Sequence, residues 1–454
     1  MFSIKQKWLI FIALACAAVM VDVDMTAINL AVHTIANSLS MSVATAKWVV
    51  DGYTIAAACL MAFGGSCADN IGDKKVFQTG LVAFMLASLA VGLSQGPVSI
   101  IVSRIIQGGC IAFTFPVAMT IAQRVFPQEE QGMAIGLLIS IAGVSQALGP
   151  TIGGAIIHLL SWRWIFLLNI PVAVLSFIIM VTCLPAPQAK ERQPIKISLL
   201  IPLIVGLFAL ITAFNEFRDL GGITSLSFLG LIVLAIISLS LFAYRELNHK
   251  TPILDLRILA SPAVNLVMMM RLLINFTYFG WLFLLGILLQ QTLGYSAFVA
   301  GVIMMSLTLV IAVLSGPVGK MIDKIGSYKV AGLGLVLALV ANIMLGMFVL
   351  FHPTWYLCLS LLVAGLAAAL LIPSNATACM GALPPEKAGA GMGMLFTAGF
   401  IGSALGVAIL GTIAEGQPSF LIGFGYCMIV AAGLSIICLL MFAGLIKHAK
   451  KQTA

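Results

Sequence analysis

Charged residues are scarce in this sequence: Asp, Glu, Lys and Arg make up 8% of its 454 positions, whereas hydrophobic residues make up 61%. Soluble domains carry about 25% charged residues, because a folded chain of this size needs a polar surface toward water. The shortage excludes a soluble globular enzyme. It predicts that most of the protein surface faces lipid.

Signatures of other protein classes are also missing. The nine cysteines include no CxxC pair, which disfavours a disulfide or zinc framework. The sequence has no GxxxxGKS nucleotide loop and no cluster of His, Cys and carboxylates with metal-ligand spacing. The net charge of +8 is scattered through short segments between apolar runs, which argues against nucleic acid as a partner. We therefore expect no enzymatic site, no metal and no cofactor.

Long apolar runs dominate the chain instead. A helix that crosses a bilayer needs about 20 mostly apolar residues, and no segment alternates as a barrel strand does. The sequence therefore predicts an all-α polytopic membrane protein with fourteen spans. The predicted spans are 8–31, 47–66, 76–95, 98–122, 133–160, 164–184, 196–214, 222–243, 263–290, 298–319, 330–351, 355–381, 390–414 and 421–446.

The basic residues predict the orientation. Fourteen spans place both termini on one side, and most of the 23 Lys and Arg residues fall in the tails and loops of that side. Only Lys47, Arg163 and Arg218 fall in loops of the opposite side. Because cytoplasmic loops are rich in Lys and Arg, we predict a multi-pass protein of the bacterial inner membrane with both termini in the cytoplasm.

One loop pattern occurs twice. Four residues recur 254 positions later at the same spacing, and a second pair of segments, 126–136 and 383–393, matches at an offset of 257. Duplicated halves of six spans are a transporter architecture. We expect halves at 1–190 and 261–454, with two inserted helices and a linker at 191–260. The repeated residues are Gly65, Asp69, Gly72 and Lys75, followed by Gly319, Asp323, Gly326 and Lys329.

The repeated aspartates have a predicted role. Asp69 and Asp323 can each accept hydrogen bonds from a helix N-terminus, where the helix dipole favours an anion, or from a basic side chain. Such contacts would hold the two halves together in one conformation. The alternative is an ordinary cytoplasmic loop with turn residues.

Five segments, in order along the chain, resemble the major facilitator superfamily, and in particular its drug:proton antiporter branch with fourteen spans. They are residues 24–31, 65–75, 104–109, 149–154 and 161–171. The resemblance implies alternating access between two halves, export driven by a proton gradient without a cofactor, function as a monomer, and in some members a periplasmic adaptor. It assigns conformational roles to Gly65, Asp69, Gly72, Lys75, Gln107, Gly108, Gly149, Pro150, Gly153, Gly154, Asp323 and Gly326.

Two oppositely charged residues lie within predicted spans. An ionised group at mid-bilayer costs about 2.5–3.5 kcal/mol, so Asp24 and Arg104 need a partner or a function. Asp24 matches the carboxylate of the related family. We predict that Asp24 faces the cavity and exchanges a proton for substrate, and that Arg104 tunes its proton affinity. The alternative is a structural ion pair.

Further polar residues are candidates for the substrate cavity. Asp22 points roughly 200° away from Asp24 on a helix, so it either enters the cavity or lies against a neighbouring helix. Arg271 lies near the start of a span, and snorkelling to the cytoplasmic boundary is expected for it. Gly149–Pro150 predicts a break in its helix, either to seal the cavity or to fill a packing gap. The cavity candidates are Asp22, Asn29, Asp51, Tyr53, Gln146, Asn275 and Tyr278.

These features predict a proton-coupled antiporter that exports small lipophilic or cationic compounds. The alternative is a dedicated exporter or importer of one metabolite, such as a siderophore or an amino acid derivative, on the same fold. A membrane sensor or scaffold would need a receiver tail or a large loop, and the predicted tails are short. A channel would not need duplicated halves with latching loops.

Overall fold

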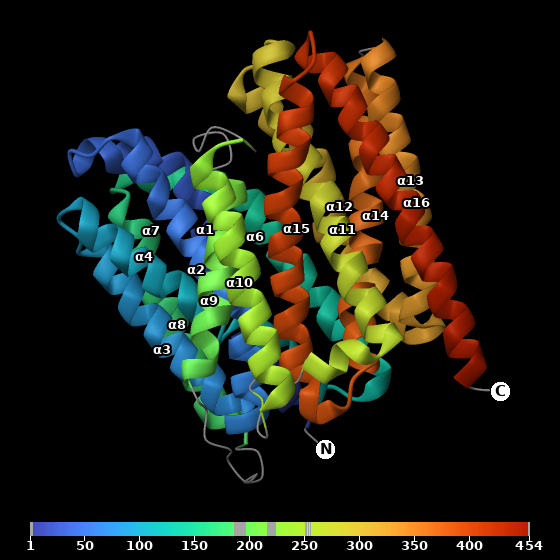
Figure 1. Ribbon diagram of the computed structural model, residues 1–454. Coiled ribbons are helices and arrows are strands. Elements are labelled where there is room, and N and C mark those ends of the chain that lie inside the picture. Colours follow the sequence, from blue (N-terminus) through green and yellow to red (C-terminus); the bar gives the residue numbers. More distant parts are fainter. Residues whose placement is uncertain are drawn as a thin grey trace.

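The computed structural model describes residues 3–185, 197–215, 224–249, 252, 254, 256–351 and 353–452. All regular secondary structure in these ranges is helical (Figure 1). The first half contains α1 (Ile4–Ser38), α2 (Val43–Ile71), α3 (Asp73–Gly92), α4 (Pro97–Ile111), α5 (Phe115–Val125), α6 (Gln131–Leu159), α7 (Arg163–Leu167) and α8 (Asn169–Cys183). Next come α9 (Leu200–Asn215) and α10 (Leu226–Asn248). The second half contains α11 (Pro262–Ile287), α12 (Ala297–Ile325), α13 (Ser327–Phe351), α14 (Thr354–Gly381), α15 (Ala388–Glu415) and α16 (Phe420–Gln452).

Twelve helical segments among the described residues are long and apolar enough to cross a bilayer, and α6 adds a thirteenth if its bent parts form one span. The apolar helix Leu200–Phe214 in α9 is shorter than the roughly 20 residues that a span needs. The predicted spans 196–214 and 222–243 both begin at residues outside the described ranges. The count of fourteen spans therefore stays a prediction.

The first repeated segment is not the loop that we expected. Residues 65–71 continue α2, and only Gly72, with φ 104°, separates α2 from α3. Gly326, with φ 88°, separates α12 from α13 in the same way. Positive φ is costly for a residue with a Cβ atom, so a glycine ends both helices. The aspartates of the repeat consequently stand on rigid helix ends.

The two halves meet along two helix pairs. α2 packs against α15 on one side, and α6 packs against α12 on the other. Glycines make these contacts close: a Cβ atom on Gly65 would overlap the backbone of Gly389, and one on Gly136 would overlap the backbone of Ser315. Small residues let membrane helices approach in this way. Helices from the first part of the chain are therefore in direct contact with helices from the last part.

The inserted helices lie outside this arrangement. α9 packs against α10 and also contacts α2 and α15, which belong to different halves (Figure 1). α10 is largely exposed, with Leu226 88% and Ile236 61% accessible. Exposed apolar side chains of this kind are suited to lipid.

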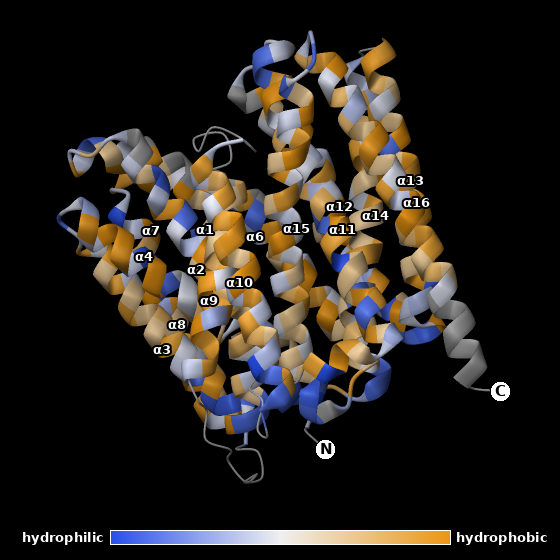
Figure 2. Ribbon diagram, viewed as in Figure 1, coloured by the Kyte–Doolittle hydropathy of each residue, from blue (hydrophilic) through white to orange (hydrophobic). Residues whose placement is uncertain are grey.

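Hydropathy divides the molecule into an apolar middle and hydrophilic ends (Figure 2). Hydrophilic residues gather most densely at the end where α1 begins and α16 ends. We call this end the terminal end. It also carries the repeated aspartates, as the contacts below show.

Candidate functional site

The repeated aspartates join the two halves at the terminal end. Asp69 on α2 accepts hydrogen bonds from the backbone N–H groups of Gly389 (2.9 Å) and Ala390 (2.7 Å), at the start of α15. An anion at a helix N-terminus is stabilised by the helix dipole and by otherwise unpaired N–H groups. This is one of the two kinds of partner that the sequence predicted for Asp69.

The second copy repeats this contact. Asp323 on α12 accepts hydrogen bonds from the backbone N–H groups of Gly132 (2.6 Å) and Met133 (2.8 Å), at the start of α6. Each half therefore supplies one carboxylate and one helix N-terminus. Lys75, the last residue of the motif, is exposed on the first turn of α3.

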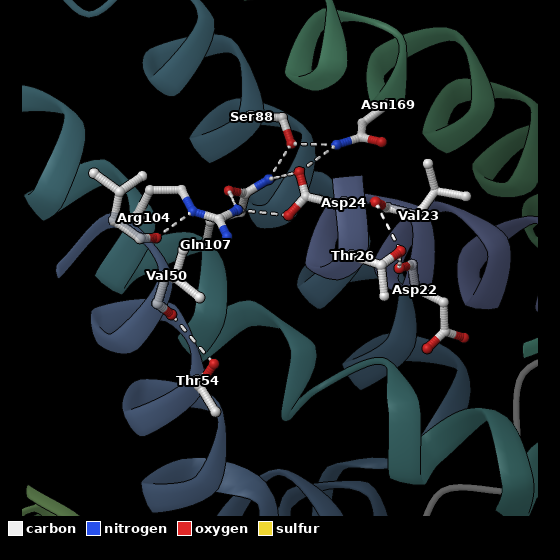
Figure 3. A network of polar contacts seen from close by, with 11 residues as sticks. Asp22, Val23, Asp24, Thr26, Val50, Thr54, Ser88, Arg104, Gln107 and Asn169 are labelled. Atoms are coloured by element: carbon white, nitrogen blue, oxygen red, sulfur yellow. Dashed lines mark hydrogen bonds and ion pairs between the residues drawn. The ribbon is translucent and has the colours of Figure 1, made fainter. Parts of the chain in front are cut away.

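A buried polar network connects four helices of the first half (Figure 3). The Nη1 atom of Arg104 lies 2.5 Å from Oδ2 of Asp24 and 2.7 Å from Oε1 of Gln107. Gln107 donates to Ser88 (2.7 Å), and Asn169 donates to Asp24 (3.2 Å). The side chains of Asp24 and Arg104 are both fully inaccessible. The ion pair is therefore inaccessible to solvent from outside the protein and has several supporting hydrogen bonds.

Arg104 also reaches α2. Its Nε donates to the backbone carbonyl of Val49 (2.9 Å), and its guanidinium carbon lies 3.9 Å from the ring centroid of Tyr53. The ring of Phe166 lies 5.4 Å from the same carbon. Contacts between a guanidinium and aromatic faces are favourable. Gly108 makes the approach of α4 to α2 possible, because a Cβ atom there would overlap the backbone of Tyr53.

A cavity of about 260 Å³ lies between the two halves. Its wall is mainly apolar and combines methionines and aromatic rings with a few polar groups. Of the predicted cavity residues, Asp22, Tyr53, Gln146, Asn275 and Tyr278 line it.

The prediction that Asp24 faces this cavity is wrong. Asp24 is not among the lining residues, whereas Asp22 is. The Oδ1 atom of Asp22 accepts a hydrogen bond from Gln146 (2.9 Å), and its side chain points away from the ion pair (Figure 3). The helical spacing allowed only one of the two carboxylates to face the cavity, and the pairing of Asp24 with Arg104 decides which one does.

Two further predictions need correction. Asp51 does not line the cavity; its carboxylate pairs with Lys47 one turn earlier on α2 (3.8 Å), a favourable spacing on a helix. Arg271 does not snorkel to a boundary, because it lies in the cavity wall, with its guanidinium carbon 5.7 Å from the ring centroid of Phe396. The side chains of Asn29 and Pro150 lie outside the part of the chain that the structure describes.

The predicted break in α6 is present. The parts Gln128–Gln146 and Thr151–Leu159 are bent by 46° relative to each other. Next to the bend, Gly149 and Gly153 pack against Thr26 and Ala27 of α1 so closely that a Cβ atom on either would overlap them. These glycines place α6 against the turn of α1 that follows both aspartates.

Two members of the buried network were not predicted as site residues. Ser88 and Asn169 lie in mostly apolar helices that also contain other polar residues, such as Gln78 in α3 and Ser176 in α8, and Asn169 falls in a segment that carried the family resemblance. The signal for both was therefore weak but present. The apolar cavity residues Met61, Phe396 and Trp281 have no distinguishing signal in a sequence that is apolar nearly throughout.

Two packed halves, a cavity between them and paired carboxylate contacts at one end define a multi-pass membrane transporter, not an enzyme. The chain belongs to the major facilitator superfamily: the model of that family, described as Major Facilitator Superfamily, matches residues 14–283 and again 267–454.

Several relatives are named as resistance proteins or transporters. The chain is 28% identical over 451 residues to the methylenomycin A resistance protein of Bacillus subtilis (strain 168), covering 97% of this chain and 94% of that protein. It is 27% identical over 409 residues to the riboflavin transporter RibZ of Clostridioides difficile (strain 630), covering 89% and 87%. A double-tryptophan variant of XylE shares the fold, with a TM-score of 0.72 at 14% identity over 97% of this chain and 96% of that one.

Proposed function

We propose that this protein exports small, predominantly apolar compounds from the bacterial cytoplasm across the inner membrane in exchange for protons. The observation that carries the proposal is the position of Tyr53: its ring contacts the guanidinium of Arg104 at 3.9 Å and also lines the cavity. A change at the buried ion pair is therefore transmitted to the substrate cavity by direct contact. Relatives named for antibiotic resistance support export.

Two carboxylates, Asp22 and Asp24, can each bind the proton. Asp22 is accessible from the cavity and can hold either a proton or a cationic group of the substrate. Asp24 holds Arg104 in place through their ion pair. A proton on Asp24 weakens this attraction, because only the ionised carboxylate balances the guanidinium charge. Arg104 is then free to shift against Val49 and Tyr53, which belong to α2.

α2 connects the movement of Arg104 to the terminal end. The same helix carries Tyr53 beside the cavity and Asp69 at the contact with α15. We infer that movement of α2 breaks the Asp69 contact, opens the terminal end and exposes the cavity on that side. The cavity lies between two halves of one chain, so a monomer is sufficient for transport.

Transport into inverted membrane vesicles tests the proposal. Wild-type protein is expected to accumulate apolar and cationic compounds when the vesicles carry a proton gradient, and to stop when an uncoupler is added. Asp24→Asn is expected to abolish accumulation. Uphill accumulation that persists after the pH difference and the voltage have both collapsed would exclude proton coupling.

A transporter of a single metabolite is the second candidate. Two observations favour it: the amide groups of Gln146 and Asn275 line the cavity, and one relative is named as a riboflavin transporter. Fixed polar groups give specificity in an otherwise apolar pocket. Competition by many unrelated compounds in the vesicle assay indicates multidrug export, whereas competition by one compound class indicates the metabolite transporter.

A further inference from the structure

Arg271 places a positive charge in the wall of the cavity. It is partly buried on α11. In the described ranges no Asp or Glu oxygen lies within 4.0 Å of its guanidinium, and its Nε atom is buried without a hydrogen-bond partner. The proposed exchange of protons does not use this residue.

The contrast with Arg104 shows how unusual this is. Arg104 is also buried, and its Nη2 atom likewise has no hydrogen-bond partner. Its charge, however, is balanced by Asp24, and Gln107 and a backbone carbonyl accept further hydrogen bonds from it. A charge inside a membrane protein is costly unless it is paired, solvated or used. The Arg271 charge faces a cavity, so its partner must enter from there.

The surroundings of Arg271 are suited to holding an anion. Asn275, one helical turn further on, also lines the cavity and adds an amide donor. Gly399 on α15 faces both: a Cβ atom there would lie 2.8 Å from Nδ2 of Asn275 and 3.1 Å from Nε of Arg271. The glycine thus leaves room for the two polar ends. A guanidinium forms two parallel hydrogen bonds with a carboxylate.

The rest of the cavity wall is suited to the apolar part of a ligand. Phe396 and Phe400 lie on the same helix as Gly399, and Trp281 and Met61 also line the cavity. Aromatic and methionine side chains bind apolar groups of varied shape. Among the described residues, Asp22 is the only other charged residue in the cavity wall; it belongs to the opposite half and forms no ion pair with Arg271 within 4.0 Å.

We propose that Arg271 and Asn275 form an anion subsite, and that the substrates of this transporter include apolar aromatic compounds carrying a carboxylate or an equivalent acidic group. The inference rests on the proposed function, because it assigns a substrate class to the same cavity. It adds to the acidic subsite at Asp22, which is suited to cationic groups. A compound carrying both groups would engage both halves.

Binding to the purified full-length protein tests the subsite without any proton gradient. Isothermal titration compares aromatic carboxylates, such as 2-naphthoate and 4-phenylbutyrate, with their methyl esters. For wild type, at least one acid is expected to bind about tenfold more tightly than its ester, since a charge-assisted pair is lost in the ester. Arg271→Gln should bring this ratio to about one, whereas Arg271→Lys should retain part of it. Arg245→Gln, an exposed charge on α10, is the matched control and should retain all of it.

The outcomes separate this inference from the proposed function. Equal binding of every acid and its ester by wild type, or a preference that survives in folded Arg271→Gln, overturns the anion subsite. If Arg271→Gln does not fold, Asn275→Ala must lower the preference severalfold for the proposal to stand. Proton-driven uptake of the neutral esters is measured on the same protein. If the esters are not taken up under a proton gradient while the preference for acids in binding persists, proton coupling is refuted and the anion subsite stands.

Discussion

Asp69 and Asp323 occupy equivalent positions in the two halves, 254 residues apart, and each accepts two backbone hydrogen bonds from a helix N-terminus in the opposite half. The partner helices, α15 and α6, are themselves equivalent in the repeat. The terminal end is thus held by two copies of one contact. Opening that end requires both to break.

Removing one of these carboxylate charges should shift the molecule toward the form that is open at the terminal end. Each contact contributes about 1–2 kcal/mol, so Asp69→Asn should change the population ratio roughly five- to thirtyfold. Hydrogen exchange detected by mass spectrometry is the measurement. Faster exchange is expected at Gly389 and Ala390, and also at Gly132 and Met133 if the two contacts open together.

Asp73→Asn is the matched control for this experiment. Asp73 lies four residues beyond Asp69 but pairs with Arg124 of its own half (2.8 Å). Its replacement should leave exchange at the four amides unchanged. An effect of Asp69→Asn confined to α15 would mean that Asp69 is only a local helix cap.

Asp24→Asn should stop proton-driven transport and lower the melting temperature as well. It leaves the Arg104 charge buried without a counter-ion, which costs about 3–5 kcal/mol. The double variant Asp24→Asn/Arg104→Gln removes both charges and should recover most of the stability. Its transport activity should remain absent, and recovery of transport together with stability would identify the pair as purely structural.

Asp22→Asn should change substrate selection with little effect on stability. In the described ranges Asp22 has no cationic partner within 4.0 Å, and an asparagine oxygen can still accept the hydrogen bond from Gln146. Vesicle uptake of a cationic dye such as ethidium should fall about tenfold, since a charge-assisted contact is lost. Uptake of a neutral compound should persist, and equal loss of both would assign Asp22 to proton coupling instead.

Gly65→Ala should impair transport by preventing the close approach of α2 and α15. A Cβ atom at this position would overlap the carbonyl of Gly389, and such overpacking costs about 1–3 kcal/mol. Gly301→Ala on α12 is the control, because a Cβ atom there meets nothing within 4 Å. Vesicle transport should be lost in Gly65→Ala and retained in Gly301→Ala. Equal activity of the two variants would show that transport tolerates a wider separation of α2 and α15.

The sequence predicted helices well because lipid exposure demands apolar runs, but it placed helix ends less well. The predicted span 47–66 corresponds to α2, which continues to Ile71. Polar residues at the bilayer boundary do not end a helix by themselves. Gly72 does, because its positive φ breaks the regular backbone. The role of Asp69 on a helix end therefore needed the structure.

The site shows a similar limit. The ionisable residues within apolar spans were visible in the sequence, and Asp24 and Arg104 do pair. Which aspartate faces the cavity depends on the rotation of α1, and that rotation is set by glycine contacts with α6. A single sequence does not fix such a rotation. The position of Arg271 in the cavity wall depends likewise on how α11 packs against α15.

The contacts of α9 with both α2 and α15 make the two sides of the molecule unequal. Of the two helix pairs that join the halves, α2 and α15 are both contacted by the inserted helix α9, whereas in the described ranges the α-helix that contacts both α6 and α12 is α14, a member of the second half. A compound dissolved in the bilayer consequently meets an inserted helix beside one of the two helix pairs and not beside the other. Passage from the membrane between α2 and α15 would require α9 to move, whereas passage between α6 and α12 would not require movement of an inserted helix.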